Sequence, residues 1–354
     1  KAIRRQRQMC IRDRRYIYGI FTVAVWSFVC LFISKRAITF TIDKEINNFL
    51  KGLFLAFIIG PGWVSYYSNF GITDVWLALI SCLSVYLVAK EKYSYGVILL
   101  TVIAELIHPG YVFLFFNFSM IIIVYKAMIE KEKFNAKFVW LFGINAFVAS
   151  TLFFILFLFA HAKEGITLEF VMNRTAEFVG KTVEEIENHR PTISDFLFRE
   201  GGDGGIRCLI QSWGFLIVGM MIVFFPFFYE IYRYWRNVYF VAKENKQKYA
   251  CFFFLIPLGA VTLVPVYIMQ NDYGRWTHAG LIYEVGIIVA MIFMKDKNVL
   301  EGTKRYMAYV KLHKWYYATL IAYAGICGAF DQNLINSIVS TIEQTIWKVI
   351  YAFA

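Results

Sequence analysis

The sequence predicts an all-α, polytopic integral membrane protein with about ten transmembrane helices and one long extracytoplasmic loop. The chain of 354 residues is 59% hydrophobic and only 17% charged, which leaves too little charge to cover a water-facing surface. Apolar runs that approach membrane-spanning length recur along it. Lysine and arginine gather in alternate connections between these runs, as they do in the cytoplasmic loops of membrane proteins.

The spans are expected where predominantly apolar runs approach the roughly 20 residues that a helix needs to cross the hydrocarbon core. Several of the runs are short. The expected spans are 16–34, 52–66, 74–89, 95–107, 110–125, 138–160, 207–229, 250–269, 279–294 and 313–330. Together they predict a single transmembrane domain over residues 16–354.

The sequence "HPG" at 108–110 separates two of these spans. It forms either a tight turn between two short helices or a proline kink inside one long helix. We predict the turn, because Pro109-Gly110 is a strong turn signal. In addition, Glu105 and His108 would be unfavourable near the centre of a bilayer.

The basic residues orient the spans. The loops expected on the cytoplasmic side are 35–51, 90–92, 126–137, 233–248 and 295–314. With two short helices around "HPG", the alternation of inner and outer loops holds from residue 35 onward. The net charge of +11 is therefore mainly an orientation signal, and we infer no nucleic-acid binding from it.

The first fifteen residues, "KAIRRQRQMCIRDRR", contradict this orientation, because they are strongly basic and would lie outside. The stretch "RRQRQMCIRDR" resembles translated sequencing-adapter read-through from assembled environmental DNA. We therefore expect residues 1–15 to be a non-native N-terminal artefact and exclude them from the fold. On this interpretation the true amino terminus, and any spans before it, are missing.

The connection 161–206 is expected on the outer face. It is too long for a simple turn, and long loops commonly carry function. Its middle, "TLEFVMNRTAEFVGKTVEEIENH", has apolar residues at helical spacing, which predicts one or two amphipathic helices on the membrane surface. The segment 334–354 shows the same pattern and is predicted to form a C-terminal amphipathic helix.

The stretch "NDYGRWTH" at 271–278 places three polar groups between two apolar runs, on the outer face. Arg275 can bind phosphate through its planar, paired donors. Asp272 can hold that guanidinium in place or act as a base, and His278 titrates near neutrality and can pass a proton. With Glu105 and His108, these residues predict a water-exposed outer pocket with an anion clamp and several acid–base groups.

Structural alternatives exist for each of these residues. Asp272 and Arg275 can be a helix-end ion pair, with Asp272 capping the following helix. Glu105 and His108 can neutralise each other through a mutual hydrogen bond. Glu284, inside the ninth expected span, is a protonated core residue, a partner for a neighbouring helix or part of the same pocket.

Two stretches carry a family resemblance. "VIAELIHPGYVFLFFNFSMIII" resembles the segment of bacterial exopolysaccharide and O-antigen polymerases (Wzy-type) in which a short apolar helix ends in a histidine at the outer face. "NDYGRW" is similar to an Asp-aromatic-Gly-Arg-Trp stretch in membrane proteins often grouped with them. The acidic first outer loop that many of these polymerases carry is not evident here.

The resemblance implies a protein of the bacterial cytoplasmic (inner) membrane that polymerises or transfers oligosaccharides carried on polyprenyl diphosphate at the outer face. Arg275 would bind the diphosphate, and His108, Glu105 or Asp272 would deprotonate the acceptor hydroxyl. The implied partners are the polyprenyl-diphosphate-linked glycan, membrane lipid and other polysaccharide-assembly proteins.

No metal or other cofactor is expected for this glycosyltransferase activity. The chain contains no Asp-x-Asp motif, which argues against metal-dependent polyprenyl-sugar glycosyltransferases, and its six cysteines show neither metal-site nor disulfide spacing. Two alternatives remain open: a transporter or flippase for lipid-linked sugars, and a noncatalytic assembly subunit.

Overall fold

The computed structural model describes residues 2–39, 43–60, 73–91, 93–159, 167–189, 214–265, 273–329 and 345. It describes only the backbone of 2–16, 37–38, 157–159, 178–179, 188–189, 214–221, 273–275 and 328–329. Within these ranges every regular element is helical and none is a strand, so the all-α prediction is confirmed.

The α-helices follow the order of the expected spans, but several of their bounds differ. The first helix already begins at Ala2, inside the excluded residues 1–15, and the helix Lys44–Ile59 begins and ends before the expected span 52–66. The helix Lys297–Leu312 occupies the loop expected at 295–314. They are α1 (Ala2–Ile38), α2 (Lys44–Ile59), α4 (Asp74–Lys90), α5 (Gly96–Ile107), α6 (Tyr111–Leu114), α7 (Phe116–Val124), α8 (Ala136–Phe159), α9 (Leu168–Val179), α12 (Gly214–Glu244), α13 (Cys251–Leu255), α15 (Tyr273–Phe293), α16 (Lys297–Leu312) and α17 (Lys314–Ala329). Three short runs have other helix types: the π-helix η1 (Tyr125–Ile129) and the 3-10 helices η2 (Glu184–His189) and η4 (Ile256–Leu263).

Three helices of the described residues are long and apolar enough to span a membrane. They are Ile17–Arg36 within α1, Ala136–Leu156 within α8 and Trp276–Phe293 within α15. The α15 segment is 78% buried and the α8 segment only 17%, so α15 is a central helix and α8 a peripheral one. Exposed Trp140 and Phe147 on α8 and Leu99 on α5 form the kind of apolar surface that lipid covers.

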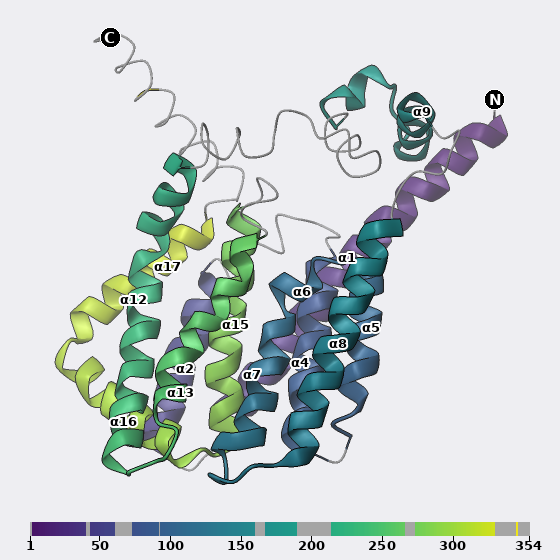
Figure 1. Cartoon of the computed structure of the whole chain (residues 1–354). Coiled ribbons are helices and arrows are strands. Elements are labelled where there is room, and N and C mark those ends of the chain that lie inside the picture. The colour runs from purple at the N-terminus through teal and green to yellow at the C-terminus, as the bar shows by residue number, and fades with distance from the viewer. Residues whose placement is uncertain are drawn as a thin grey trace, which may run out of the picture.

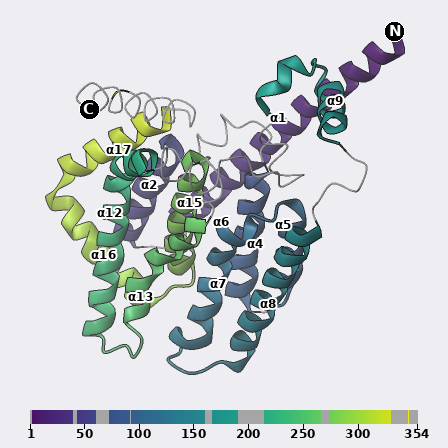
Figure 2. The same ribbon diagram turned by 45° about the horizontal axis from the view of Figure 1, so that its top comes forward.

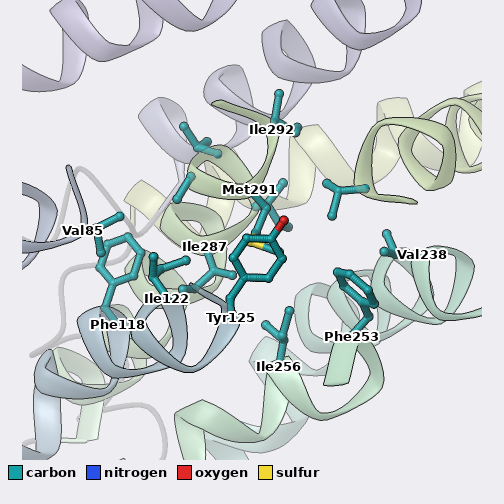
Figure 3. Packing of buried hydrophobic residues seen from close by; sticks show 14 of the residues in the cluster. Val85, Phe118, Ile122, Tyr125, Val238, Phe253, Ile256, Ile287, Met291 and Ile292 are labelled. Atoms are coloured by element: carbon teal, nitrogen blue, oxygen red, sulfur yellow. The ribbon is translucent and has the colours of Figure 1, made fainter. Parts of the chain in front are cut away.

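The core is built around α15. In the larger apolar cluster, Ile287 and Met291 of α15 pack with Ile122 of α7 and Phe253 of α13 (Figure 3). A second cluster joins Tyr111 and Leu114 of α6 to Trp276 and other residues near the start of α15. Burial of these side chains fixes α15 between the α4–α8 helices and the α12–α13 pair (Figure 1).

The "HPG" turn is present as predicted. The α5 helix ends at Ile107, and the backbone amide of Tyr111 donates to the His108 carbonyl over 3.0 Å. The amide of Gly110 donates to Nδ1 of His108 over 2.9 Å. A Cβ at Gly110 would lie 2.8 Å from that nitrogen, so the turn requires glycine there.

The connections between helices lie at two opposite ends of the bundle. The turns after α4, η1, α12 and α15 lie together at the bottom of Figure 1, whereas α5 ends and α15 begins toward the top; Figure 2 shows the same separation. The bottom turns carry the lysines predicted for cytoplasmic loops, among them Lys90, Lys131, Lys246 and Lys295. We call the bottom the basic end and the top the far end.

The α12 helix extends well past the expected span end at 229 and includes residues that the sequence assigns to a loop. One face of this extension packs against α16. The backbones approach so closely that a Cβ at Gly302 would lie 2.7 Å from the Cα of Val238. Contact with α16 therefore continues the helix where the apolar run alone would end it.

After α13 the chain changes to a 3-10 helix, η4, which contains Pro257. Side chains of other helices bind its carbonyl groups: Nδ2 of Asn117 donates to Gly259 over 2.7 Å, and the Tyr283 hydroxyl donates to Ile256 over 2.9 Å. A Cβ at Gly259 would overlap the Tyr283 hydroxyl. The irregular backbone is thus stabilised by specific partners, as a low-dielectric environment requires.

Only part of the expected outer loop is described. Within 161–206, α9 begins at the N-cap Thr167 and ends before Gly180, whose φ is +69°. Met172 and Ala176 of α9 pack against Ile186 of η2, and α9 lies at the far end in Figure 1. The predicted C-terminal helix 334–354 lies outside the described residues, apart from residue 345.

Candidate functional site

The far end holds the backbone of four of the five sequence-predicted site residues. Glu105 lies in the last turn of α5, and His108 follows that helix. Arg275 and His278 lie in the first two turns of α15, although the Arg275 side chain is not among those described. Asp272 falls outside the described residues.

Glu105 is completely buried, with 0% exposure. Neither of its carboxylate oxygens has a hydrogen-bond partner among the described residues, so the mutual hydrogen bond considered for Glu105 and His108 is not observed. Burying a carboxyl group without partners is unfavourable by several kcal/mol when it is charged. The side chain is therefore suited to hold a proton or to bind a ligand group.

Hydroxyl groups accompany Glu105. Thr101 lies one turn before it on the same face of α5, and Ser84 of α4 and Tyr111 of α6 are also fully buried. None of the three hydroxyls makes a hydrogen bond of normal geometry within the described residues, but those of Ser84 and Thr101 lie close to that of Tyr111. We call Ser84, Thr101, Glu105 and Tyr111 the buried polar cluster. Both carboxylate oxygens of its Glu105 lack a partner in the described part of the fold.

The two histidines have different surroundings. The His108 ring is partly exposed and its Nδ1 accepts the Gly110 amide in the turn. His278 is 1% exposed, and neither ring nitrogen has a partner in the described residues. Its ring meets Phe224 edge-on, with centroids 6.0 Å apart. Apolar side chains of the second cluster, including Tyr111 and Trp276, pack between α5 and α15. Within the described residues, Glu105 and His278 therefore do not share the water-exposed pocket that the sequence predicted.

A second group of polar residues, which sequence reasoning missed, lies deeper in the bundle. Glu230 of α12 is 6% exposed. It accepts hydrogen bonds from the hydroxyls of Tyr306 over 2.9 Å, Tyr316 over 3.0 Å and Tyr317 over 2.6 Å. Nη1 of Arg233 lies 3.1 Å from the same carboxylate. We call these five residues the tyrosine cluster.

The tyrosine cluster joins α12 to the corner between α16 and α17. Arg233 lies one turn after Glu230, and its guanidinium also stacks on the rings of Tyr229 at 4.7 Å and Tyr309 at 4.6 Å. The sequence signal was an acid and an arginine three residues apart, followed much later by the tyrosine-rich stretch "YMAYVKLHKWYY" at 306–317. Nothing in that spacing showed that the two stretches meet.

A cavity of about 220 Å³ lies beside the tyrosine cluster, between α2, α12, α15, α16 and α17. Its walls are almost entirely apolar, and among the described residues that line it only Glu230 is charged. Leu281 of α15 lines it, only three residues after His278. The cavity therefore begins about one helical turn from the candidate site at the far end.

Compared with known proteins, the chain matches no family model, no curated protein and no solved structure. Among the described residues, no three His, Cys, Asp or Glu side chains gather as a metal site would require.

Proposed function

We propose that the protein is a membrane enzyme that polymerises or transfers glycan units carried on polyprenyl diphosphate. The observation that carries this proposal is that the lysine-rich turns and the candidate site residues lie at opposite ends of the bundle. Lysine-rich turns occupy one end, and the α5 turn and the first turns of α15 share the other (Figure 1). This separation supports an outer-face site made from Glu105, His108, Asp272, Arg275 and His278.

In the membrane we propose about ten spans, with the shorter apolar helices crossing beside the three long ones. The basic end faces the cytoplasm, because lysine and arginine collect on that side of membrane proteins. The far end, with α9, then faces outward. This arrangement suits the cytoplasmic membrane of a bacterium and a substrate delivered on its outer leaflet.

The proposed reaction forms a bond between an acceptor hydroxyl oxygen and the anomeric carbon of the donor sugar. The bond from that carbon to the diphosphate oxygen breaks, and the electron pair stays on the diphosphate. Arg275, in the first turn of α15, stabilises that leaving group together with the positive end of the helix dipole. Glu105, His108 or Asp272 takes the hydroxyl proton, and His278 can pass it on.

The test is complementation of a strain that lacks its own polymerase, with the wild-type chain and with Arg275→Ala and His108→Ala. Each substitution should lower the yield of long chains on the order of 100-fold, because charge stabilisation or proton transfer is lost. Single repeat units should remain. Arg174→Ala is the control, because Arg174 is an exposed arginine on α9, also at the far end. Long chains from both variants, at normal membrane abundance, would reject the site.

A transporter or flippase of lipid-linked sugars is the second candidate. The observation that favours it is the interrupted helix α13–η4, with buried Glu284 on the neighbouring α15. Broken helices and buried acidic groups at mid-depth are typical of transporters. In the same complementation strain, accumulation of the lipid-linked substrate on the inner leaflet would favour this candidate over the enzyme.

A further inference from the structure

We propose that the cavity between α2, α12, α15, α16 and α17 binds the isoprenoid chain of the lipid whose diphosphate lies at the far end. This inference rests on the proposed function and names the part of the substrate that the far end does not hold. Three features of the cavity support it: its chemistry, its direction and the packed aromatic rings toward its basic end.

The chemistry of the cavity fits a hydrocarbon. Its walls are mainly aliphatic and aromatic. Among the described residues that line it, only Glu230 is charged, and it is paired with Arg233 and three tyrosine hydroxyls. The cavity therefore presents no unbalanced charge. A sugar or an ion would lose its hydration there without compensation, whereas an apolar chain would gain from burial.

The direction of the cavity follows the helices. On α15 it is lined by Leu281, Val285 and Ile288, and on α12 by Phe227, Ile231 and Tyr234. Within each set the residues are four and then three positions apart, so they lie on one face of their helix. Seven residues of α-helix extend the cavity for about 10 Å along the bundle axis. Its upper limit at Leu281 lies one turn from His278, near the proposed diphosphate position.

Aromatic side chains from three helices meet where the cavity approaches the basic end. Phe49 of α2 stacks on Tyr234 with ring centroids 5.2 Å apart, and Tyr234 meets Tyr306 edge-on at 5.6 Å. The tyrosine cluster holds the α16–α17 corner against α12 beside these rings. A chain that enters from the far end would meet these packed rings, which suits a bound tail rather than a permeating solute.

Gly52 of α2 provides a direct test. It lines the cavity, and a Cβ at this position would have nothing within 4 Å. A phenylalanine there would fill part of the cavity without a clash at its Cβ. Gly143 of the exposed helix α8 is the matched control, because its Cβ would also meet nothing within 4 Å.

The experiment uses the full chain in nanodiscs of phosphatidylcholine and phosphatidylglycerol. The probe is geranylgeranyl phosphate carrying a diazirine near the end of its chain and an alkyne for detection. We expect saturable labelling that unlabelled geranylgeranyl phosphate competes away, with labelled peptides from α2, α12 or α17. Gly52→Phe should reduce labelling on the order of tenfold, and Gly143→Phe should leave it unchanged.

Labelling confined to the exposed faces of α8 and α1, or equal labelling of wild type and Gly52→Phe, would overturn the proposal. A second arm uses phosphatidylglycerol with a diazirine on its acyl chain. If this probe labels the cavity and geranylgeranyl phosphate does not compete, the cavity holds an acyl chain and the isoprenoid assignment fails. Peptide mapping in the wild type keeps the test decisive even if Gly52→Phe does not fold.

The labelling experiment needs neither a glycan substrate nor catalysis, so its result does not depend on the proposed enzymatic activity. Cavity labelling together with retained polymer in Arg275→Ala cells would reject the enzyme and keep the chain site. Loss of polymer in Arg275→Ala cells with no cavity labelling would reject the chain site and keep the enzyme.

Discussion

Glu105 and Glu230 are both buried in the helical bundle, but their surroundings are opposite. Glu230 is bound by three tyrosine hydroxyls and an arginine, whereas neither oxygen of Glu105 has a hydrogen-bond partner in the described residues. A buried carboxylate with a full set of partners stabilises the contact between its helices. A buried carboxyl without them destabilises the fold and is therefore a candidate for function.

Replacing Glu230 should have the largest effect. Glu230→Ala leaves the Arg233 charge and three tyrosine hydroxyls without their acceptor, which should lower the free energy of unfolding by about 3 kcal/mol. The unfolding of purified protein in mixed detergent, followed by SDS titration, measures this. Tyr317→Phe removes only one donor and should lower it by about 1 kcal/mol. Equal stability of wild type and Glu230→Ala would mean that the tyrosine cluster does not hold the α16–α17 corner.

Replacing Glu105 should have an intermediate effect of the opposite sign. Glu105→Leu removes an unpaired buried carboxyl group and should raise the free energy of unfolding by about 1 kcal/mol. The same variant should lose polymer in the complementation assay. Tyr111→Phe, from the same cluster, should change stability less. Its hydroxyl lies close to those of Ser84 and Thr101 but makes no hydrogen bond of normal geometry in the described residues. A destabilised Glu105→Leu would show that Glu105 has a structural partner after all.

The smallest effect is expected at Asp43, an ion-paired carboxylate near the surface. Asp43 caps α2, and its carboxylate lies 2.6 Å from Nζ of Lys304 on α16. The hydrogen bond from Lys304 is the main cause that lowers the pKa of Asp43, and the α2 backbone amides lower it further. Because its pKa is lower in the folded state, Asp43 stabilises the fold above the usual aspartate pKa of about 3.9.

The stabilisation by ionised Asp43 should be lost as the pH falls from about 4 through the lowered pKa of Asp43, where the carboxylate becomes protonated. The SDS unfolding midpoint should decrease over this range in wild type and decrease less in Asp43→Asn. Identical pH profiles would show that the pair contributes nothing to the α2–α16 contact. The effect should also weaken with added salt, because the pair lies at the surface.

The sequence predicts the helices and the "HPG" turn well because both depend on local signals. Apolar runs define α4, α5 and α8, and Pro109-Gly110 with His108 defines the turn. The end of α12 was not predictable, because it depends on how closely Gly302 of α16 approaches Val238. A glycine in a sequence does not reveal which helix packs against it.

The two buried glutamates show that, at the candidate site too, the sequence reveals local signals but not contacts between distant helices. Glu105 stands out in the sequence as an acid within an apolar run. The sequence placed it in a water-exposed pocket, but the structure buries it completely. Glu230 falls between the expected span 207–229 and the expected loop 233–248, beside polar and basic residues, and nothing in the sequence singles it out. Its partners Tyr306 and Tyr317 are 76 and 87 positions away in the chain, and only the α16–α17 corner brings them to it.

The 3-10 helix η4 is longer than an α-helix of its eight residues would be. A 3-10 helix rises about 2.0 Å per residue and an α-helix about 1.5 Å, so converting these residues would shorten the segment by about 4 Å. Asn117 and Tyr283 bind carbonyl groups that α-helical hydrogen bonds would need. These two side chains therefore hold η4 at its extended length and set the level in the bundle at which it ends.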